Sequence, residues 1–145
     1  MKNYDVTIIG GGGAGLTAAL YTSRAKLSTL LLEKLTPGGQ IALTDIVENY
    51  PGFPEGVTGQ EISQRMEDQA KRYGTEVLYQ EVSGIEKKDG NFLVKTAGEE
   101  NFMSRAVILA TGASYRNLKV PGEKEFTGRG VSYCATCDGA FFKEK

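Results

Sequence analysis

The sequence predicts an α/β fold that begins with a Rossmann-like dinucleotide-binding domain. Three observations point to it: the apolar run DVTIIG, the glycine-rich GGGGAG with a helical pattern directly behind it, and a second apolar run, STLLLEK. Together they give strand, helix and strand in about thirty residues, the length of one βαβ unit. A chain of 145 residues is long enough for one ordinary domain with its own core and leaves little room for a second.

The first apolar run, DVTIIG, is short, rich in β-branched residues and does not alternate, which is typical of a strand buried on both faces of a parallel sheet. The segment LTAALYTSRAK has a helical spacing of small and apolar residues at Leu16, Ala19, Leu20 and Ser23. STLLLEK predicts the second buried strand. The crossover between two such strands is almost always right-handed.

The middle of the chain predicts a long loop, a helix and a small β-meander. The loop TPGGQIALTDIVENYPGFPEGV contains three of the four prolines, and a loop of this length is usually functional. The helix starts at Thr58, with Glu61 at capping-box spacing, has Ile62, Met66, Ala70 and Tyr73 on one face, and ends at Gly74. Several strands follow, with a turn at 88–91 (KDGN) and a last, buried strand in AVILATG.

Charge and hydropathy exclude several classes of protein. Seventeen basic and eighteen acidic residues leave a net charge of −1, with no basic run for nucleic acid. No stretch approaches the roughly 18 apolar residues that span a membrane, and the N-terminus lacks a small-residue cleavage site. We therefore expect a cytoplasmic protein with neither a membrane nor a nucleic-acid partner. In the cytoplasm, two cysteines favour redox chemistry or metal binding over a permanent disulfide.

The glycine-rich loop predicts a dinucleotide site. Gly10, Gly12 and Gly15 form GxGxxG, in which the first glycine permits a tight turn, the second a close approach of pyrophosphate, and the third close helix–strand packing. The N-terminus of the following helix favours the negative charge of the phosphates. Glu33 ends the next strand, eighteen residues after Gly15, at the place where a carboxylate accepts ribose hydroxyls. This motif fits FAD and NAD equally.

A second motif lies near the end of the sequence. Cys134 and Cys137 form Cys-Ala-Thr-Cys, a spacing that closes a small disulfide ring, and Asp138 is placed to exchange a proton during thiol–disulfide exchange. The alternative is half of a zinc site. With no histidine and no third cysteine, zinc would require two chains to pool four thiolates. We expect a redox dithiol and no metal.

Taken in order, GGGGAG, LLLEK, PGGQ, VENYPGF, ILATGAS, VPGE and CATCDGAFF resemble the low-molecular-weight thioredoxin reductases of bacteria and archaea, over essentially the whole chain. The resemblance implies FAD. It implies pyrophosphate contacts from the glycine loop, a ribose contact from Glu33 and an adenine contact from Val82. It also implies flavin contacts from the loop at 38–40 and from Asn49, and contacts near the phosphates from Thr111 and Gly112. The residues implied to bind FAD are Gly10, Gly12, Gly13, Ala14, Gly15, Glu33, Gly38, Gly39, Gln40, Asn49, Val82, Thr111 and Gly112.

The resemblance also implies roles for the dithiol. Cys137 faces the flavin, Cys134 attacks the disulfide of thioredoxin or a thioredoxin-like protein, and Asp138 is the acid–base residue. NADPH would reduce the flavin, and the intact parent would be a homodimer. The expected organisation is an incomplete FAD-binding domain at 1–116, a hinge at 117–123, and the start of an NADPH-binding domain at 124–145.

Since such reductases continue well beyond the CxxC motif, the chain is expected to be an N-terminal part that retains FAD weakly, exposes apolar surface and tends to associate. Four alternatives stay open at this point. They are the flavin subunit of a peroxide-reducing system, a ferredoxin-dependent relative, an FAD-binding or interaction module without turnover, and a zinc-linked dimer.

Overall fold

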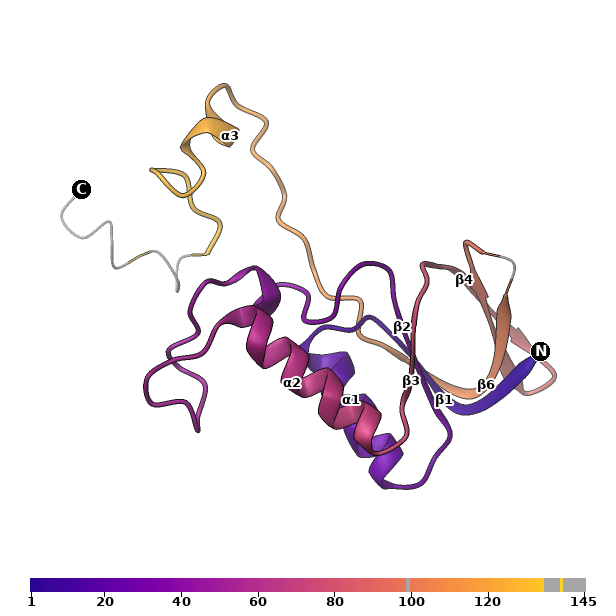
Figure 1. Ribbon diagram of the computed structural model, residues 1–145. Coiled ribbons are helices and arrows are strands. Elements are labelled where there is room, and N and C mark those ends of the chain that lie inside the picture. The colour runs from indigo at the N-terminus through magenta and orange to yellow at the C-terminus, as the bar shows by residue number, and fades with distance from the viewer. Residues whose placement is uncertain (99, 135–138, 140–145) are drawn as a thin grey trace. The chain divides into compact units, whose positions relative to one another are not determined.

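A computed structural model describes residues 1–98, 100–134 and 139 of the chain. The chain divides into two compact units, one of residues Met1–Gly112 and one that begins at Ala113. The first contains a sheet with helices, and the second a short helix among turns (Figure 1). Each unit is described by itself below.

The first unit is built on a six-stranded mixed sheet with strand order β3-β2-β1-β6-β5-β4. The central strand β1 pairs in parallel with β2 on one side and with β6 on the other, so the predicted βαβ start and α/β class are confirmed. The last three strands form the predicted antiparallel meander. The bounds are β1 Lys2–Ile9, β2 Thr29–Glu33, β3 Glu76–Tyr79, β4 Val82–Lys88, β5 Asn91–Thr96 and β6 Asn101–Leu109.

Two helices, α1 (Gly13–Arg24) and α2 (Gly59–Arg72), pack side by side against one face of the parallel strands (Figure 1). The core between them contains Leu16 and Ala19 from α1, Ala70 from α2, and apolar side chains of β1 and β2. The predicted start of α2 is confirmed, because the Thr58 side chain accepts the N–H of Glu61 at 3.1 Å. A single 3₁₀ turn, η1 (Ile41–Leu43), lies in the proline-rich loop.

The meander covers the other face of the parallel strands. Val94 of β5 and Phe102 of β6 pack with Tyr4, Leu30 and Leu32 in a second apolar cluster. The hairpin between β4 and β5 turns at the predicted position. Its two turn residues, Asp89 and Gly90, both have positive φ (50° and 81°), as the tight hairpin turn requires.

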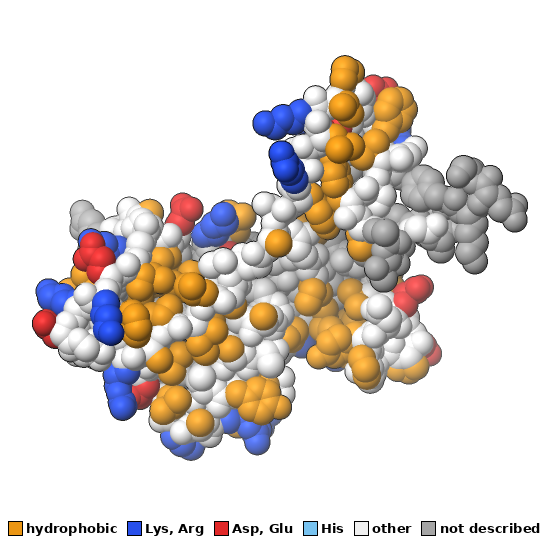
Figure 2. All heavy atoms as spheres, turned by 180° about the vertical axis from the view of Figure 1, so that it is seen from behind, with side chains coloured by type: hydrophobic (Ala, Val, Ile, Leu, Met, Phe, Trp, Pro, Cys, Tyr) orange, Lys and Arg blue, Asp and Glu red, His pale blue; other side chains and the backbone are white. Residues whose placement is uncertain are grey.

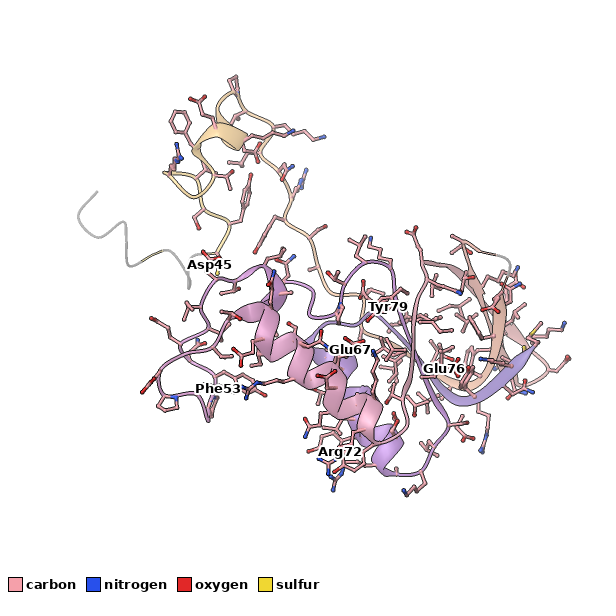
Figure 3. The ribbon with its side chains drawn as sticks, viewed as in Figure 1. Asp45, Phe53, Glu67, Arg72, Glu76 and Tyr79 are labelled. Carbon is pink, nitrogen blue, oxygen red and sulfur yellow. The ribbon has the colours of Figure 1, made fainter. Side chains whose placement is uncertain are left out.

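A buried acid on α2 is a feature that the helical pattern does not predict. The side chain of Glu67 is 2% exposed, although it lies beside the apolar face of the helix. Its carboxylate accepts hydrogen bonds from the Tyr79 hydroxyl on β3 and from the Lys71 ammonium, both at 2.6 Å (Figure 3). The Tyr79 hydrogen bond thereby attaches the helix to the edge strand of the sheet, and the ion pair with Lys71 within the helix balances the buried charge.

AVILATG forms a strand as far as Leu109, the end of β6, but the expectation that this strand is buried is wrong, because none of its residues is fully buried. β6 pairs with β5 only through residues 101–104, and beyond that point Ala106 and Leu109 are exposed, Leu109 by 67%. The reason is that the meander turns away from the second half of β6, so no described strand pairs with its outer edge there. Figure 2 shows several patches of exposed hydrophobic side chains on the face that it views. Leu35, Leu43 and Leu109 are each more than two thirds exposed.

In its described residues, the second unit contains one short helix, α3 (Glu123–Phe126), within a series of turns. The buried Glu123 carboxylate accepts the backbone N–H groups of Leu118 at 2.9 Å and Lys119 at 2.6 Å. Backbone hydrogen bonds between Phe126 and Val131 and between Gly128 and Val131 close the following turn. The described part of this unit is therefore held in its fold by hydrogen bonds between residues close in sequence.

Candidate dinucleotide site and redox segment

The turn between β1 and α1 depends on two glycines. Gly10 has φ +105°, and a Cβ there would lie 2.3 Å from the carbonyl oxygen of Ala110. A Cβ at Gly15 would lie 1.8 Å from the carbonyl oxygen of Gly10. Both distances are far below van der Waals contact, so the helix reaches the sheet this closely only because both residues lack side chains.

The N-terminus of α1 is open. Gly12 is its N-cap and makes no side-chain capping hydrogen bond, and a Cβ at Gly12 would meet nothing within 4 Å. The first backbone N–H groups of a helix have no partner within the helix and carry its partial positive charge. An open, uncapped helix end of this kind fits the pyrophosphate of a dinucleotide. Gly13 and Ala14 lie in this first turn.

Glu33 lies at the end of β2 beside the glycine loop, with its carboxylate fixed by two backbone groups. Oε2 accepts the N–H of Gly11 at 2.7 Å, and Oε1 accepts the N–H of Leu35 at 3.0 Å. Each oxygen keeps a second lone pair, so the carboxylate is oriented and still able to accept ribose hydroxyls.

Gly11 is a site residue that the sequence reasoning missed. A Cβ at Gly11 would lie 3.1 Å from Cβ of Glu33, so its missing side chain leaves the space in which the acid packs. The available signal was the run of four glycines, of which the GxGxxG pattern uses only the first and third.

A groove of about 210 Å³ runs from the glycine loop past Glu33. The predicted residues Gly10, Glu33, Val82 and Thr111 all line it, so the structure brings together groups from four separate segments. Its remaining lining residues, which the sequence reasoning did not select, are Ile9, Leu32, Lys34, Gln80 and Glu81. Gly112, directly after Thr111, has φ +70° and is exposed.

The loop with Gly38 and Gly39 also lies against the glycine loop. The Gly38 N–H donates to the carbonyl oxygen of Gly11 at 2.7 Å, and a Cβ at Gly39 would lie 3.5 Å from Cα of Gly12. Gln40 follows as the N-cap of η1. Asn49 lies further along the same loop, exposed, and is not among the residues that line the groove.

The redox segment belongs to the second unit. Cys134 is disulfide-bonded and partly buried. Its backbone N–H donates to the hydroxyl of Ser132 at 3.1 Å, and that hydroxyl donates to the Cys134 carbonyl oxygen at 3.3 Å. Cys137 and Asp138 lie outside the described residues. Within the part of the chain that the structure describes, no three His, Cys, Asp or Glu side chains are grouped as a metal site would need.

The sheet order, the glycine loop at the start of α1 and the acid at the end of β2 define an α/β dinucleotide-binding protein. The family model for pyridine nucleotide-disulphide oxidoreductases matches residues 4–145. The chain therefore belongs to this family.

Comparison with individual proteins agrees with the resemblance predicted from the motifs. The chain is 57% identical to the thioredoxin reductase of Bacillus subtilis (strain 168) over 145 residues, and 53% identical to that of Listeria monocytogenes. These alignments cover 99% of the chain and 45% and 44% of the two relatives. The chain thus spans a little under half the length of the relatives it matches.

Two of the similar solved structures are also thioredoxin reductases. The thioredoxin reductase of Lactococcus lactis is 49% identical with a TM-score of 0.77, over 96% of this chain and 45% of that one. That of Streptococcus pyogenes is 46% identical with a TM-score of 0.84, over 97% and 45%. The fold class and the resemblance to thioredoxin reductases are confirmed. None of the helices in the described part of the chain is long and apolar enough to cross a membrane.

Proposed function

We propose that the chain is the N-terminal part of a cytoplasmic thioredoxin reductase-like flavoprotein that binds FAD at the glycine loop. The observation that carries this proposal is the Glu33 carboxylate, fixed by the N–H groups of Gly11 and Leu35 beside the open N-terminus of α1. Its free lone pairs suit the ribose of the adenosine half, and the uncapped helix suits the pyrophosphate. Gly38, Gly39, Gln40 and Asn49 are proposed for the flavin half.

FAD, when bound, supplies two-electron transfer between a nicotinamide donor and a disulfide. In the proposed parent the donor is NADPH. The chain's own contribution to this transfer is the dithiol of Cys134 and Cys137, and the Cys-X-X-Cys spacing beside Asp138 favours exchange chemistry over a module that only binds.

The exchange is proposed to occur in two steps. The Cys134 thiolate attacks a sulfur of the partner's disulfide, which forms an interchain S–S bond and releases the second partner sulfur as a thiolate. The Cys137 thiolate then attacks Cys134, which releases the reduced partner and leaves the Cys134–Cys137 disulfide. Asp138 is proposed to supply a proton to a leaving thiolate. The proposed partner is thioredoxin or a protein like it, and the proposed parent is a homodimer.

The test is equilibrium binding of FAD to the 145-residue chain, followed by flavin fluorescence. Glu33→Ala is expected to weaken binding about tenfold or more, because it removes the acceptor of the ribose hydroxyls. Glu86→Ala is the matched control, since Glu86 is an exposed acid on β4 that does not line the groove. Equal affinity of wild type and Glu33→Ala, or no binding by the wild type even at high FAD concentration, would contradict the proposal.

A further inference from the structure

Two tyrosines of the second unit, far apart in sequence, contact each other next to the redox cysteine. The rings of Tyr115 and Tyr133 stack with centroids 5.2 Å apart and planes inclined by 22°. Tyr133 is bonded directly to Cys134. The stack therefore joins the beginning of the second unit to the backbone from which the cysteine projects.

The contact depends on the rings and not on the hydroxyl of Tyr133. Its Oη is buried and has no hydrogen-bond partner among the described residues. A buried hydroxyl without a partner is unfavourable, so only the aromatic ring gains from its position. Phenylalanine would make the same stack without that cost.

The segment between the two tyrosines is itself fastened at its far end. The Glu123 carboxylate accepts the N–H groups of Leu118 and Lys119, and the backbone of Thr127 and Val131 forms a β-bridge. The chain thus leaves Tyr115, passes through this turn and returns to Tyr133, where the stack closes the loop. Directly before Tyr133, the Ser132 hydroxyl accepts the backbone N–H of Cys134 and donates to the Cys134 carbonyl oxygen.

We propose that Tyr115 is a positioning residue for Cys134. By stacking on Tyr133 it fixes the backbone at the cysteine, so that the sulfur is held where its disulfide forms. The inference rests on the proposed redox function and adds a residue that neither the CxxC motif nor the dinucleotide site contains. Loss of the stack would remove a contact that orders the backbone next to Cys134, so the cysteine would be held less firmly.

The test is the redox equilibrium of the 145-residue chain with glutathione. Oxidation of the Cys134–Cys137 dithiol by glutathione disulfide forms one intrachain S–S bond and two molecules of glutathione, so the equilibrium constant measures how well the two thiols are held together. Tyr115→Ala is expected to lower this constant about fivefold, a factor within the range of a single aromatic pair. Tyr133→Ala should do the same.

Two further results are required. Tyr115→Phe and Tyr133→Phe should leave the constant at the wild-type value, because both keep the stacking ring. The double variant Tyr115→Ala/Tyr133→Ala should fall no further than either single variant, since each alanine already removes the same contact. The urea midpoint of the first unit serves as a structural readout and should be unchanged in all five variants.

An unchanged constant in Tyr115→Ala would overturn the inference, as would additive losses in the double variant or a loss in Tyr115→Phe as large as in Tyr115→Ala. The glutathione equilibrium needs neither FAD nor a partner protein. Its outcome is therefore independent of the FAD-binding test of the proposed function, and failure of one is distinguishable from failure of the other.

Discussion

Residues 1–112 bury apolar side chains on both faces of a six-stranded sheet, whereas the second unit, from Ala113, is stabilised by separate local interactions. In the first unit the glycine loop and Glu33 are fixed by packing and by backbone hydrogen bonds that the sheet itself arranges. In the described residues of the second unit, the Glu123 carboxylate, the Tyr115–Tyr133 stack, the Ser132 hydroxyl and a few turns order the backbone up to Cys134.

This difference fits the different roles proposed for the two units. A binding site for a cofactor as large as FAD benefits from a rigid scaffold, because many contacting groups must be held in place at the same time. The proposed dithiol would meet first an electron donor and then a partner protein, and such a group benefits from a small unit whose order depends on few contacts. Substitutions in the first unit should therefore act on global stability, and substitutions in the second on local order alone.

The largest expected effect is at the helix–sheet contact. Gly15→Ala places a methyl group 1.8 Å from the Gly10 carbonyl oxygen, so the helix or the loop must move. We expect a loss of about 3 kcal/mol in the free energy of unfolding, measured by urea denaturation. Gly84→Ala is the control, because a Cβ at Gly84 meets nothing within 4 Å and its φ is ordinary. Equal urea midpoints for the two variants would contradict the packing argument.

A smaller effect is expected at the buried acid of α2. The hydrogen bond from Tyr79 to Glu67, together with burial, raises the pKa of the Tyr79 hydroxyl from its ordinary 10 to about 12. Because the pKa is raised in the folded state, the stability that this contact contributes is complete below pH 10 and is lost as the pH rises through about 12.

Glu67→Gln should therefore return the pKa of Tyr79 toward 10, as followed by tyrosinate absorbance. It should cost about 1 kcal/mol at neutral pH, a modest value because Tyr79 is 52% exposed and solvent screens the contact. Tyr79→Phe isolates the contribution of Tyr79, since burial and a hydrogen bond to Glu76 also raise the pKa of Tyr4. A titration curve that is the same in wild type and Glu67→Gln would show that the acid does not control this hydroxyl.

The smallest effect on global stability is expected at Glu123. Lys119 has φ 60°, an unfavourable value for a residue with a side chain. Its backbone N–H donates a hydrogen bond to the Glu123 carboxylate. In Glu123→Gln, amide hydrogen exchange at Leu118 and Lys119 should accelerate about tenfold, while the urea midpoint of the first unit stays unchanged.

Glu125→Gln, on the exposed side of the same short helix, should leave exchange at both amides at the wild-type rate. If Glu123→Gln also lowered the urea midpoint of the first unit, the two units would not be stabilised independently, and the comparison drawn above would fail.

Much of the first unit was predictable because its signals are local. The strand DVTIIG, the glycine turn, the capped start of α2 at Thr58 and the hairpin turn at Asp89 and Gly90 are each specified by a few neighbouring residues. Glu33 could likewise be selected by its distance from the glycines. The domain limits and the roles of the site residues near Cys134 stay predictions.

Other features could not be predicted from the local pattern. AVILATG has the composition of a buried strand, but burial depends on what packs beside it, and the meander leaves Leu109 exposed. Glu67 has the composition of a surface residue, and it is buried because Tyr79 and Lys71, from β3 and the next helical turn, pair with it. Such pairing depends on the arrangement of elements, not on their separate periodicities.

The sequence by itself determined the class of fold and the place of the glycine-rich loop, because both rest on backbone geometry specific to glycine and on local apolar patterns, while the dithiol stays a prediction from its cysteine spacing. Tertiary structure alone decided that Gly11 orients Glu33, that four separate segments line one groove, and that Tyr115 meets Tyr133. These are contacts between segments distant along the chain, and they exist only after folding has brought those segments together.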